Sequence, residues 1–275
     1  MRTNKYKLLV LSDLKNSVDS TLKSTVSLAK IIGGEITFFH VKKASDVVED
    51  ENQLSAKRTI NQKHFATKRK IESLINPIKE AYGVNITTSF SYGNVKYEIE
   101  SYLKENKPDI IVLGKRKASR LGLIGDNITS FILNNFNGVV MIASNKKALE
   151  PSEEIGLGML NASNKQIDFE FAKDLMANTQ KPLKSFKIIK KASEEIKGQN
   201  QLNENSVEYV FEQADNNIKV IDKYLLKNNI NLLCIDRASH QNKNKLSAKK
   251  SNIEEVIDNL NVSFLVTGSK NLNRR

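Results

Sequence analysis

The sequence has one cysteine, no tryptophan, three histidines and no apolar run approaching the roughly 20 residues that a membrane-spanning helix needs. The single cysteine, Cys234, excludes an internal disulfide, and its place in an apolar segment predicts a buried thiol. The first residues lead into a strand-like segment without the apolar core of a signal peptide. We therefore expect a cytoplasmic protein with no membrane contact.

Groups that perform enzymatic chemistry are also scarce. The histidines, His40, His64 and His240, fall on a strand end, a helix and a polar loop, with no cysteine or carboxylate at a metal-ligand spacing. No Gly-x-Ser-x-Gly motif and no Gly-x4-Gly-Lys-Ser/Thr loop is present. We expect no catalytic residues and no metal site, and at most weak ATP hydrolysis.

Positive charge is in excess, with a formal net charge of +12. Clustered Lys and Arg would favour nucleic acid, because they release counterions from phosphates. Here the cations are spread among 31 acidic residues, and no aromatic residues are interleaved with them in the sequence. A solvated basic surface is the favoured interpretation, and nucleic acid is the least favoured partner.

Strand and helix patterns alternate through the first half. Apolar runs predict strands at residues 7–11, 35–41, 85–90, 109–114 and 139–143, and three- and four-residue periodicity predicts helices at 17–32, 62–82, 95–105 and 127–134. The polar stretch 46–62 is expected to be a mobile loop, and Pro77 to kink or break the long helix. Alternation of this kind predicts an α/β fold with a parallel sheet.

The second half repeats the first. Tyr102 and Tyr224 occupy matching positions 122 residues apart, and the same offset aligns the strand at 110–113 with residues 232–235. Further strands are expected at 155–160, 183–189, 207–211 and 263–267, with a helix at 168–177. A duplicated fold predicts two domains, residues 1–146 and 153–275.

The loop after the strand at 109–114 is the strongest candidate for a ligand site. It runs from Gly114 to Gly125 before a helix, and its cations are Lys115, Arg116, Lys117 and Arg120. Glycines, cations and a helix N-terminus favour an anion, and open α/β sheets bind ligands at the carboxyl ends of their strands. The alternative is that the loop is basic and exposed but binds no ligand. For Gly114 the alternative is a plain turn that ends the strand.

Three further residues have two interpretations each. Asp13, at the end of the first strand, could accept hydrogen bonds from a ribose or an adenine, or cap the helix that begins near Ser17. Val41 and Val112 could line an adenine pocket, although valines at strand ends are more often core residues.

A first strand ending in Asp13, a second ending in His40-Val41 and a fourth ending in Gly114 together resemble the universal stress protein family. The duplication resembles its tandem two-domain members and extends the resemblance over the whole chain. It implies two open five-stranded parallel sheets of strand order 3-2-1-4-5, with helices on both faces, of the adenine nucleotide alpha hydrolase-like type. It also implies an intramolecular pseudo-dimer joined through the strands at 139–143 and 263–267.

Nucleotide-binding members of that family carry Gly-x2-Gly-x9-Gly-Ser/Thr after the fourth strand and an aspartate after the first. Asp13, Gly114 and Gly125 match this pattern, whereas Lys117 replaces the second glycine and Asp126 replaces the Ser/Thr. The loop is also two residues shorter, and a carboxylate at Asp126 competes with phosphate for backbone N–H groups. The resemblance implies a site for ATP with Mg²⁺ formed by Asp13, Val41, Val112, Gly114, Lys115, Arg116, Lys117, Gly125, Asp126 and Asn127.

The second half departs further from the pattern. Asn161 stands where the first half has Asp13, Asp236-Arg237 replaces Gly114-Lys115, and the loop at 240–247 contains no glycine. We expect a degenerate partner domain there. The chain as a whole is expected to be a stress-response protein that binds ATP in its first domain, with unknown protein partners and a further homodimer left open. The alternative is a scaffold that binds no nucleotide and acts through dimerisation and protein contacts.

Overall fold

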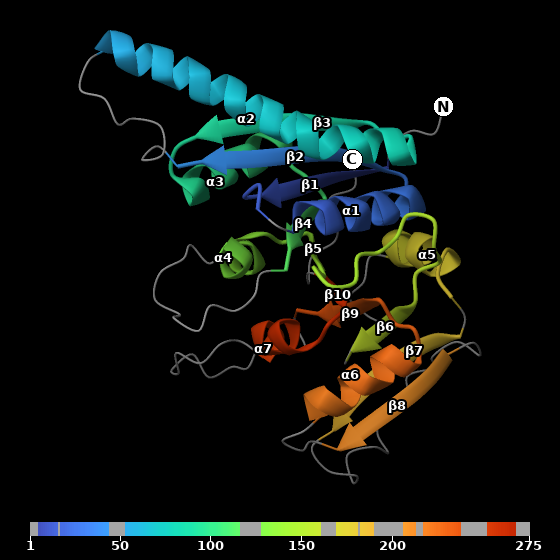
Figure 1. Cartoon of the computed structure of the whole chain (residues 1–275). Helices are drawn as coiled ribbons and strands as arrows, with labels where there is room; N and C mark the ends of the chain where they lie inside the picture. Colours follow the sequence, from blue (N-terminus) through green and yellow to red (C-terminus); the bar gives the residue numbers. More distant parts are fainter. Residues whose placement is uncertain are drawn as a thin grey trace, which may run out of the picture.

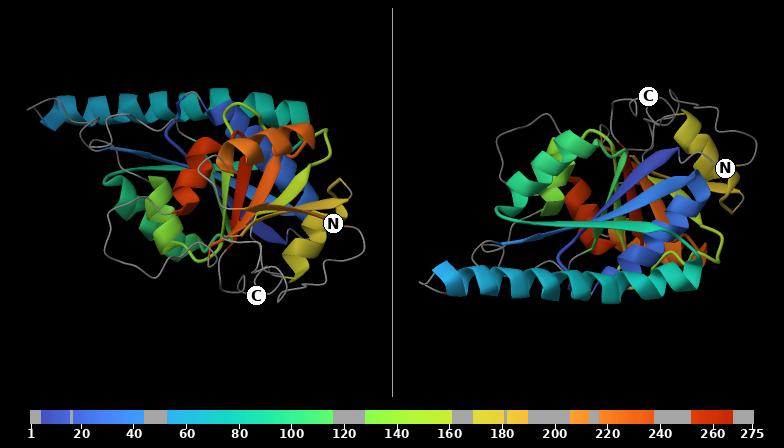
Figure 2. Two further views of the ribbon diagram at one scale, coloured as in Figure 1. Left: turned by 90° about the horizontal axis from the view of Figure 1, so that it is seen from below. Right: turned by 90° about the horizontal axis from the view of Figure 1, so that it is seen from above.

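In the part of the chain that the structure describes, ten strands form one twisted sheet between two layers of helices (Figures 1 and 2). The computed structural model describes residues 5–15, 17–43, 53–115, 128–160, 169–180, 182–189, 206–212, 217–237 and 252–267. The strands are β1 (Tyr6–Ser12), β2 (Gly34–Lys42), β3 (Ile86–Tyr92), β4 (Ile110–Gly114), β5 (Val139–Ala143), β6 (Leu157–Leu160), β7 (Leu183–Ile189), β8 (Ser206–Glu212), β9 (Leu232–Asp236) and β10 (Ser263–Thr267). The helices are α1 (Val18–Ile32), α2 (Gln53–Tyr82), α3 (Val95–Asn106), α4 (Ile128–Asn135), α5 (Phe169–Ala177), α6 (Asn217–Lys227) and α7 (Asn252–Asn259).

The strand order is β3-β2-β1-β4-β5-β10-β9-β6-β7-β8. Each half therefore has the expected order 3-2-1-4-5, with all neighbouring strands parallel inside a half. The two halves meet where β5 pairs antiparallel with β10, and Met141 lies opposite Leu265 at this seam. The two expected five-stranded sheets are thus one continuous sheet.

Two hydrophobic layers hold the helices to the sheet. One layer packs α1, α2 and α5 on one face, through side chains such as Leu22, Ile75 and Phe171. The other packs α3, α4, α6 and α7 on the opposite face, through side chains such as Ile132 and Leu225. Equivalent helices of the two halves share a face, so a pseudo-twofold axis runs through the sheet at the β5–β10 seam.

Helix α2 differs from the sequence prediction. Residues 53–62, expected to belong to a loop, form its first turns, and the helix continues through Pro77 without the expected break. Ser73 and Pro77 are exposed, so the carbonyl that the proline leaves without an N–H partner faces water. The remainder of the predicted loop, 46–52, lies outside the described residues.

The halves also differ on the face that α2 covers. Val10 of β1 pairs with the buried Phe38, whereas the equivalent Met159 of β6 pairs with Ser185. Ser185 in turn pairs with Glu208. In the described part of the second half no helix corresponds to α2, and Ser185 occupies the position of the aromatic core residue Phe38.

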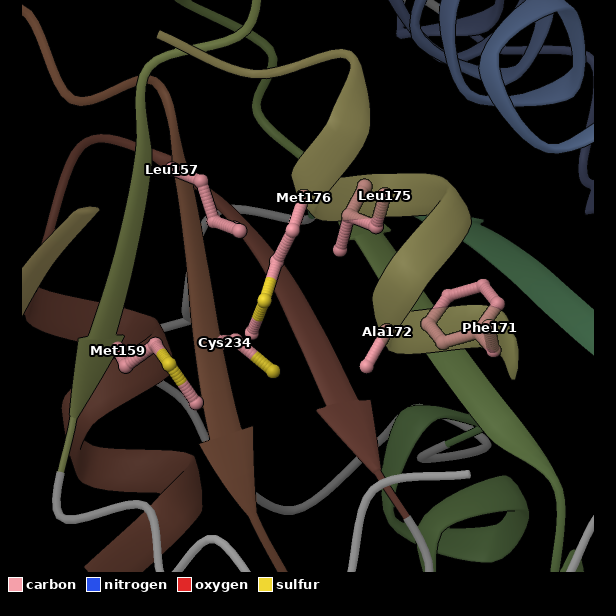
Figure 3. Close-up of a pocket in the computed structure, with 7 residues that line it drawn as sticks. All are labelled: Leu157, Met159, Phe171, Ala172, Leu175, Met176 and Cys234. Carbon is pink, nitrogen blue, oxygen red and sulfur yellow. The ribbon is translucent and has the colours of Figure 1, made fainter. Parts of the chain in front are cut away.

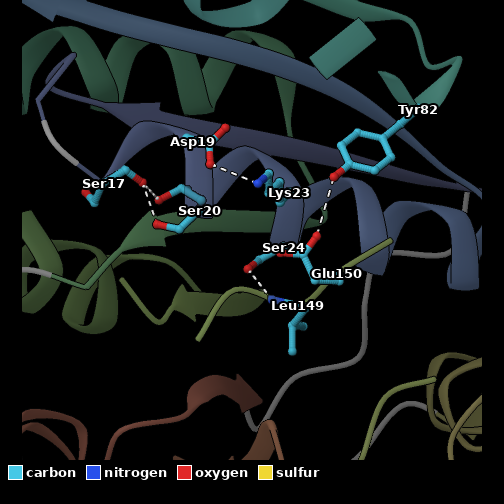
Figure 4. A network of polar contacts seen from close by, with 9 residues as sticks. Ser17, Asp19, Ser20, Lys23, Ser24, Tyr82, Leu149 and Glu150 are labelled. Carbon is cyan, nitrogen blue, oxygen red and sulfur yellow. Dashed lines mark hydrogen bonds and ion pairs between the residues drawn. The ribbon is translucent and has the colours of Figure 1, made fainter. Parts of the chain in front are cut away.

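The segment between the halves is attached to the first half (Figure 4). The Leu149 N–H donates to Ser24 Oγ of α1 at 2.9 Å, and the Tyr82 hydroxyl donates to Glu150 at 3.4 Å. Leu149 itself is fully buried. A domain division between residues 146 and 153 stays a prediction. Among the described helices, none is both long and apolar enough to cross a membrane.

Candidate functional site

The carboxyl ends of β2, β1 and β4 lie side by side in the first half. Ser12 of β1 pairs with His40 of β2, and Leu11 pairs with Leu113 of β4. The chain after β1 enters α1 on one face of the sheet, whereas the chain after β4 leads to α4 on the other face. Two adjacent strands whose connections diverge form a topological switch point, which is where open α/β sheets bind ligands.

Asp13 forms the turn between β1 and α1. One of its carboxylate oxygens accepts a hydrogen bond from the Lys15 N–H at 3.1 Å, and Ser12 Oγ accepts one from the Leu14 N–H at the same distance. Leu14 takes a left-handed conformation, with φ of 59°, that these two side-chain bonds support. Asp13 thus shapes the entry to α1, and the carboxylate itself stands at the switch point.

His40 fixes the ends of β1 and β2 together. Its Nδ1 lies 2.8 Å from the Ser12 carbonyl oxygen, a distance at which a protonated Nδ1 donates a hydrogen bond. The side chain is 7% exposed, and this burial lowers the pKa of His40 below its usual value. A neutral, buried imidazole of this kind is a core residue beside the site.

Gly114 is packed against the first turn of α1. A Cβ at this position would lie 2.6 Å from Thr21 Oγ1 and 2.7 Å from Ser17 Oγ, closer than real Cβ atoms approach other groups. The close passage of β4 beside α1 therefore accounts for the glycine without a ligand. It also places the N-terminus of α1, whose Ser17 makes no side-chain cap, next to the end of β4.

Lys115 reaches across the seam into the second half. Its ammonium donates to the Leu260 carbonyl at 2.5 Å, just past the end of α7, and lies 5.9 Å from the centre of the Phe264 ring. Burial lowers the pKa of Lys115. A cation at a helix C-terminus is favourable, because the last carbonyls are unpaired and the helix dipole is negative there. Lys115 was predicted to bind phosphate, and in the structure its ammonium is instead bonded to a backbone carbonyl of the second half.

Arg237 makes the equivalent contact in the opposite direction. It follows β9 as Lys115 follows β4, and its guanidinium donates to the carbonyls of Phe136 and Gly138, just past α4. Burial lowers the pKa of Arg237 as well. We call the contacts of Lys115 and Arg237 the two seam bridges. Sequence reasoning missed them, although the repeat aligns one cation with the other.

The two valines predicted to line an adenine pocket are not brought together. Val112 is fully buried in the layer that holds α1. Val41 is partly buried and packs against the hydrophobic layer on the opposite face of the sheet. The other predicted site residues, Arg116, Lys117, Gly125, Asp126 and Asn127, lie outside the described residues.

The corresponding edge of the second half is acidic. Asp236, which takes the place of Gly114, is 2% exposed at the end of β9. A carboxylate at this position would repel an anion, and the expectation of a degenerate second half stays a prediction. Asn161 and the loop at 240–247 lie outside the described residues. Within the described ranges, no group of three His, Cys, Asp or Glu side chains is placed to hold a metal ion.

A small apolar pocket lies under α5 in the second half (Figure 3). Its central space is about 10 Å³, room for one water molecule at most. Burial raises the pKa of the Cys234 thiol in its wall to about 12, so this thiol stays protonated at neutral pH. The pocket is too small for a nucleotide and is a packing feature. It is lined by Leu157, Met159, Phe171, Ala172, Leu175, Met176 and Cys234.

Comparison with known proteins agrees with this architecture. The family model described as "Universal stress protein family" matches residues 6–143. The crystal structure of a universal stress protein from Archaeoglobus fulgidus aligns with 96% of this chain and 98% of its own, at 16% identity and a TM-score of 0.66. A Pseudomonas aeruginosa structure described as a universal stress protein aligns over 95% of this chain and 92% of its own, at 14% identity and a TM-score of 0.58. No curated protein matches the sequence.

Proposed function

Because the chain belongs to the universal stress protein family, we propose that its first half binds an adenine nucleotide, with ATP accompanied by Mg²⁺ as the candidate ligand. In this proposal the nucleotide state of a cytosolic stress-response protein alters its contacts with other proteins. The second half contributes no second site, because Asp236 stands where the first half has Gly114. Pairing of two chains into a homodimer belongs to the same proposal.

The observation that carries the proposal is the switch point between β1 and β4. Asp13 stands there after β1, and the N-terminus of α1 lies beside Gly114 at the end of β4. A helix N-terminus attracts phosphate through its unpaired N–H groups, and a carboxylate accepts hydrogen bonds from ribose hydroxyls or an adenine amine. A bound nucleotide would bring negative charge to this edge of the sheet. Asp13 and the N-terminus of α1 would hold the nucleotide in a fixed orientation.

Two residues of the predicted site fit a ligand less well. The space in front of Gly114 is occupied by Ser17 and Thr21, so the glycine does not leave a cradle for phosphate. The Lys115 ammonium is bonded to Leu260. The phosphate contacts in the proposal therefore fall to Arg116, Lys117, Gly125 and Asn127, together with the α1 N-terminus, whereas Asp126 would compete with phosphate for backbone N–H groups.

These same two contacts favour a second candidate function, a scaffold that binds no nucleotide. Gly114 and Lys115 both have a structural role that needs no ligand. In this alternative the fold serves to join the halves through β5 and β10 and to present their surfaces to protein partners.

The test is isothermal titration of ATP with Mg²⁺ into the full chain and into two Asp13 variants. Asp13→Asn keeps a side-chain oxygen to accept the Lys15 N–H and preserves the turn, whereas Asp13→Ala removes both the oxygen and the charge. We expect micromolar binding at one site per chain, weakened in Asp13→Asn and weakened at least as much in Asp13→Ala. Asp174→Ala, which removes an aspartate paired with Lys5, is the control.

Absence of binding at millimolar ATP would contradict the proposal and favour the scaffold. Equal affinity in Asp13→Asn and the parent chain would show that the carboxylate is not a contact. Thermal denaturation of each variant without nucleotide separates a lost contact from a lost fold.

A further inference from the structure

Helix α2 projects beyond the sheet that it covers. It has 30 residues, about 45 Å at the usual rise of a helix, whereas β3 has 7 residues and spans about 24 Å. Its second part is anchored to the core by Ile71, Ile75 and Ile78. The first turns consequently extend past the carboxyl ends of β2 and β3, as all views show (Figures 1 and 2).

This first part of α2 is strongly basic. From Gln53 to Ile71 the helix contains no acidic residue, and its cations are Lys57, Arg58, Lys63, Lys68, Arg69 and Lys70. The first acidic residue is Glu72, which pairs with Lys68 at 4.0 Å at the surface. An exposed pair of this length neutralises little of the charge.

The fold also brings aromatic rings to this basic segment. The ring of His64 lies 4.7 Å from Phe90 of β3 and 6.0 Å from Phe65, measured between ring centres. The Phe90 ring is in turn 5.8 Å from Tyr92. His64 and Phe65 stand among the cations of α2 in the sequence, whereas Phe90 and Tyr92 of β3 are brought to them only by the fold.

The side chains of His64 and Phe65 in this cluster are exposed to solvent. Phe65 is 60% exposed, and Lys68 and Arg69, three and four residues further along the helix, share its face and are exposed. We use the name α2 patch for Lys63, His64, Phe65, Lys68, Arg69 and Phe90. An exposed ring bordered by cations is what a surface needs to stack a base and neutralise its phosphates.

We propose that the α2 patch binds single-stranded nucleic acid. Cations on α2 contact the phosphates, and unpaired bases stack on Phe65 and His64. An anionic membrane is a poorer occupant, because Ile71, Ile75 and Ile78 of α2 are buried against the sheet, and a peripheral helix inserts such apolar side chains into the membrane. An acidic peptide would use the charges and leave the exposed ring without a role. This function does not depend on a nucleotide at the switch point.

The test is fluorescence anisotropy of the full chain with labelled RNA and DNA oligomers of about 12 unpaired nucleotides, within the usual site size. We expect binding that weakens as salt rises. Phe65→Ala should weaken it about tenfold, the usual effect of removing one stacking partner. The matched control is Tyr97→Ala, since Tyr97 is 69% exposed on α3, on the opposite face of the sheet.

A second pair of variants tests the charges. Arg69→Gln should reduce the slope of log affinity against log salt by about one, whereas Lys104→Gln, which removes an exposed lysine paired with Glu100 on α3, should leave it unchanged. If RNA and DNA bind with equal affinity, base stacking and phosphate charge account for the binding of both. If RNA binds more tightly, the patch also contacts the ribose 2′-hydroxyl.

Three results would overturn the proposal. The first is no binding at low salt, and the second is equal loss in Phe65→Ala and Tyr97→Ala. The third is binding to anionic vesicles or to duplex of the same length that exceeds binding to single strands. All four substitutions replace exposed side chains, and circular dichroism melting verifies that each variant keeps the parent fold.

Discussion

Replacement of Arg237 by methionine tests whether the seam bridges hold the two halves together. The guanidinium donates to two carbonyls past the end of α4, one of them at the long distance of 3.4 Å. A hydrogen bond from a charged donor contributes about 1.5–3 kcal/mol. Burial of the guanidinium opposes this gain, and its Nε is buried without a partner among the described residues. We expect Arg237→Met to lower the free energy of unfolding by about 2 kcal/mol.

Lys115→Met should cost less, about 1 kcal/mol, because its ammonium has one carbonyl partner and a distant aromatic ring. Arg237→Lys should fall between the parent chain and Arg237→Met, since an ammonium keeps the charge and cannot span both carbonyls. The measurement is urea denaturation at neutral pH without nucleotide, followed by far-ultraviolet circular dichroism.

The control is Lys104→Met, which removes an exposed cation and its surface pair with Glu100 and should change stability by less than about 0.5 kcal/mol. If Arg237→Met unfolds at the same urea concentration as Lys104→Met, the seam bridge does not stabilise the fold. Full stability in Arg237→Lys would show that charge alone, without the two-carbonyl geometry, is sufficient.

Two further predictions concern the edge of the first half. Gly114→Ala should destabilise the ligand-free chain by about 1–3 kcal/mol through its clash with Thr21 and Ser17, and Ser17→Gly should restore part of the loss; an unchanged melting temperature would refute the packing role. Because burial lowers the pKa of His40, the unfolded chain takes up its proton first on acidification. The stability from neutral His40 is therefore fully present above about pH 6.5 and is lost as pH falls through the lowered pKa. As the pH falls from 7.5 to 5.5, the urea midpoint of the parent chain should decrease relative to that of His40→Phe, and a constant difference would contradict the assignment.

Much of the sheet could be predicted from local sequence. The bounds predicted for β5 and for β10 are those of the structure, because each is a short apolar run with polar residues at both ends. The order 3-2-1-4-5 followed from the family resemblance and is confirmed in both halves. These features depend on patterns a few residues long or on a motif that the chain carries.

The errors concern elements that lack such a pattern. Residues 53–62 have few apolar anchors, and their helical state follows from elongation of a helix that Ile71 and Ile75 fix further on. Pro77 was predicted to kink or break that helix; the helix is not broken, because the exposed position of Pro77 makes the missing hydrogen bond tolerable. Neither fact is visible before the helix is placed on the sheet.

The candidate site was partly predictable for a related reason. A lysine after a strand end has the same local sequence whether it binds phosphate or a carbonyl, and the partner of Lys115 lies 145 residues away. Gly114 was predicted to belong to a ligand site or to form a plain turn, and the structure packs it against Ser17 and Thr21 of α1. The residue types indicated which groups could bond or pack closely, but only the folded structure shows which residues they contact.

The two halves differ most at the ends of β4 and β9 and on the sheet face that α2 covers in the first half. They agree most at the seam between β5 and β10. Gly114 corresponds to Asp236, and Phe38 to Ser185, yet a cation follows both β4 and β9 and reaches the end of the opposite half's last helix. If the second half served only to pair β10 with the edge strand β5, no cation would be needed after β4 or β9. Because Lys115 directly follows β4, its bond to Leu260 links the carboxyl end of β4 to the second half. The second half thus contacts the first half beside its switch point, even though Asp236 takes the place of Gly114 in the second half itself.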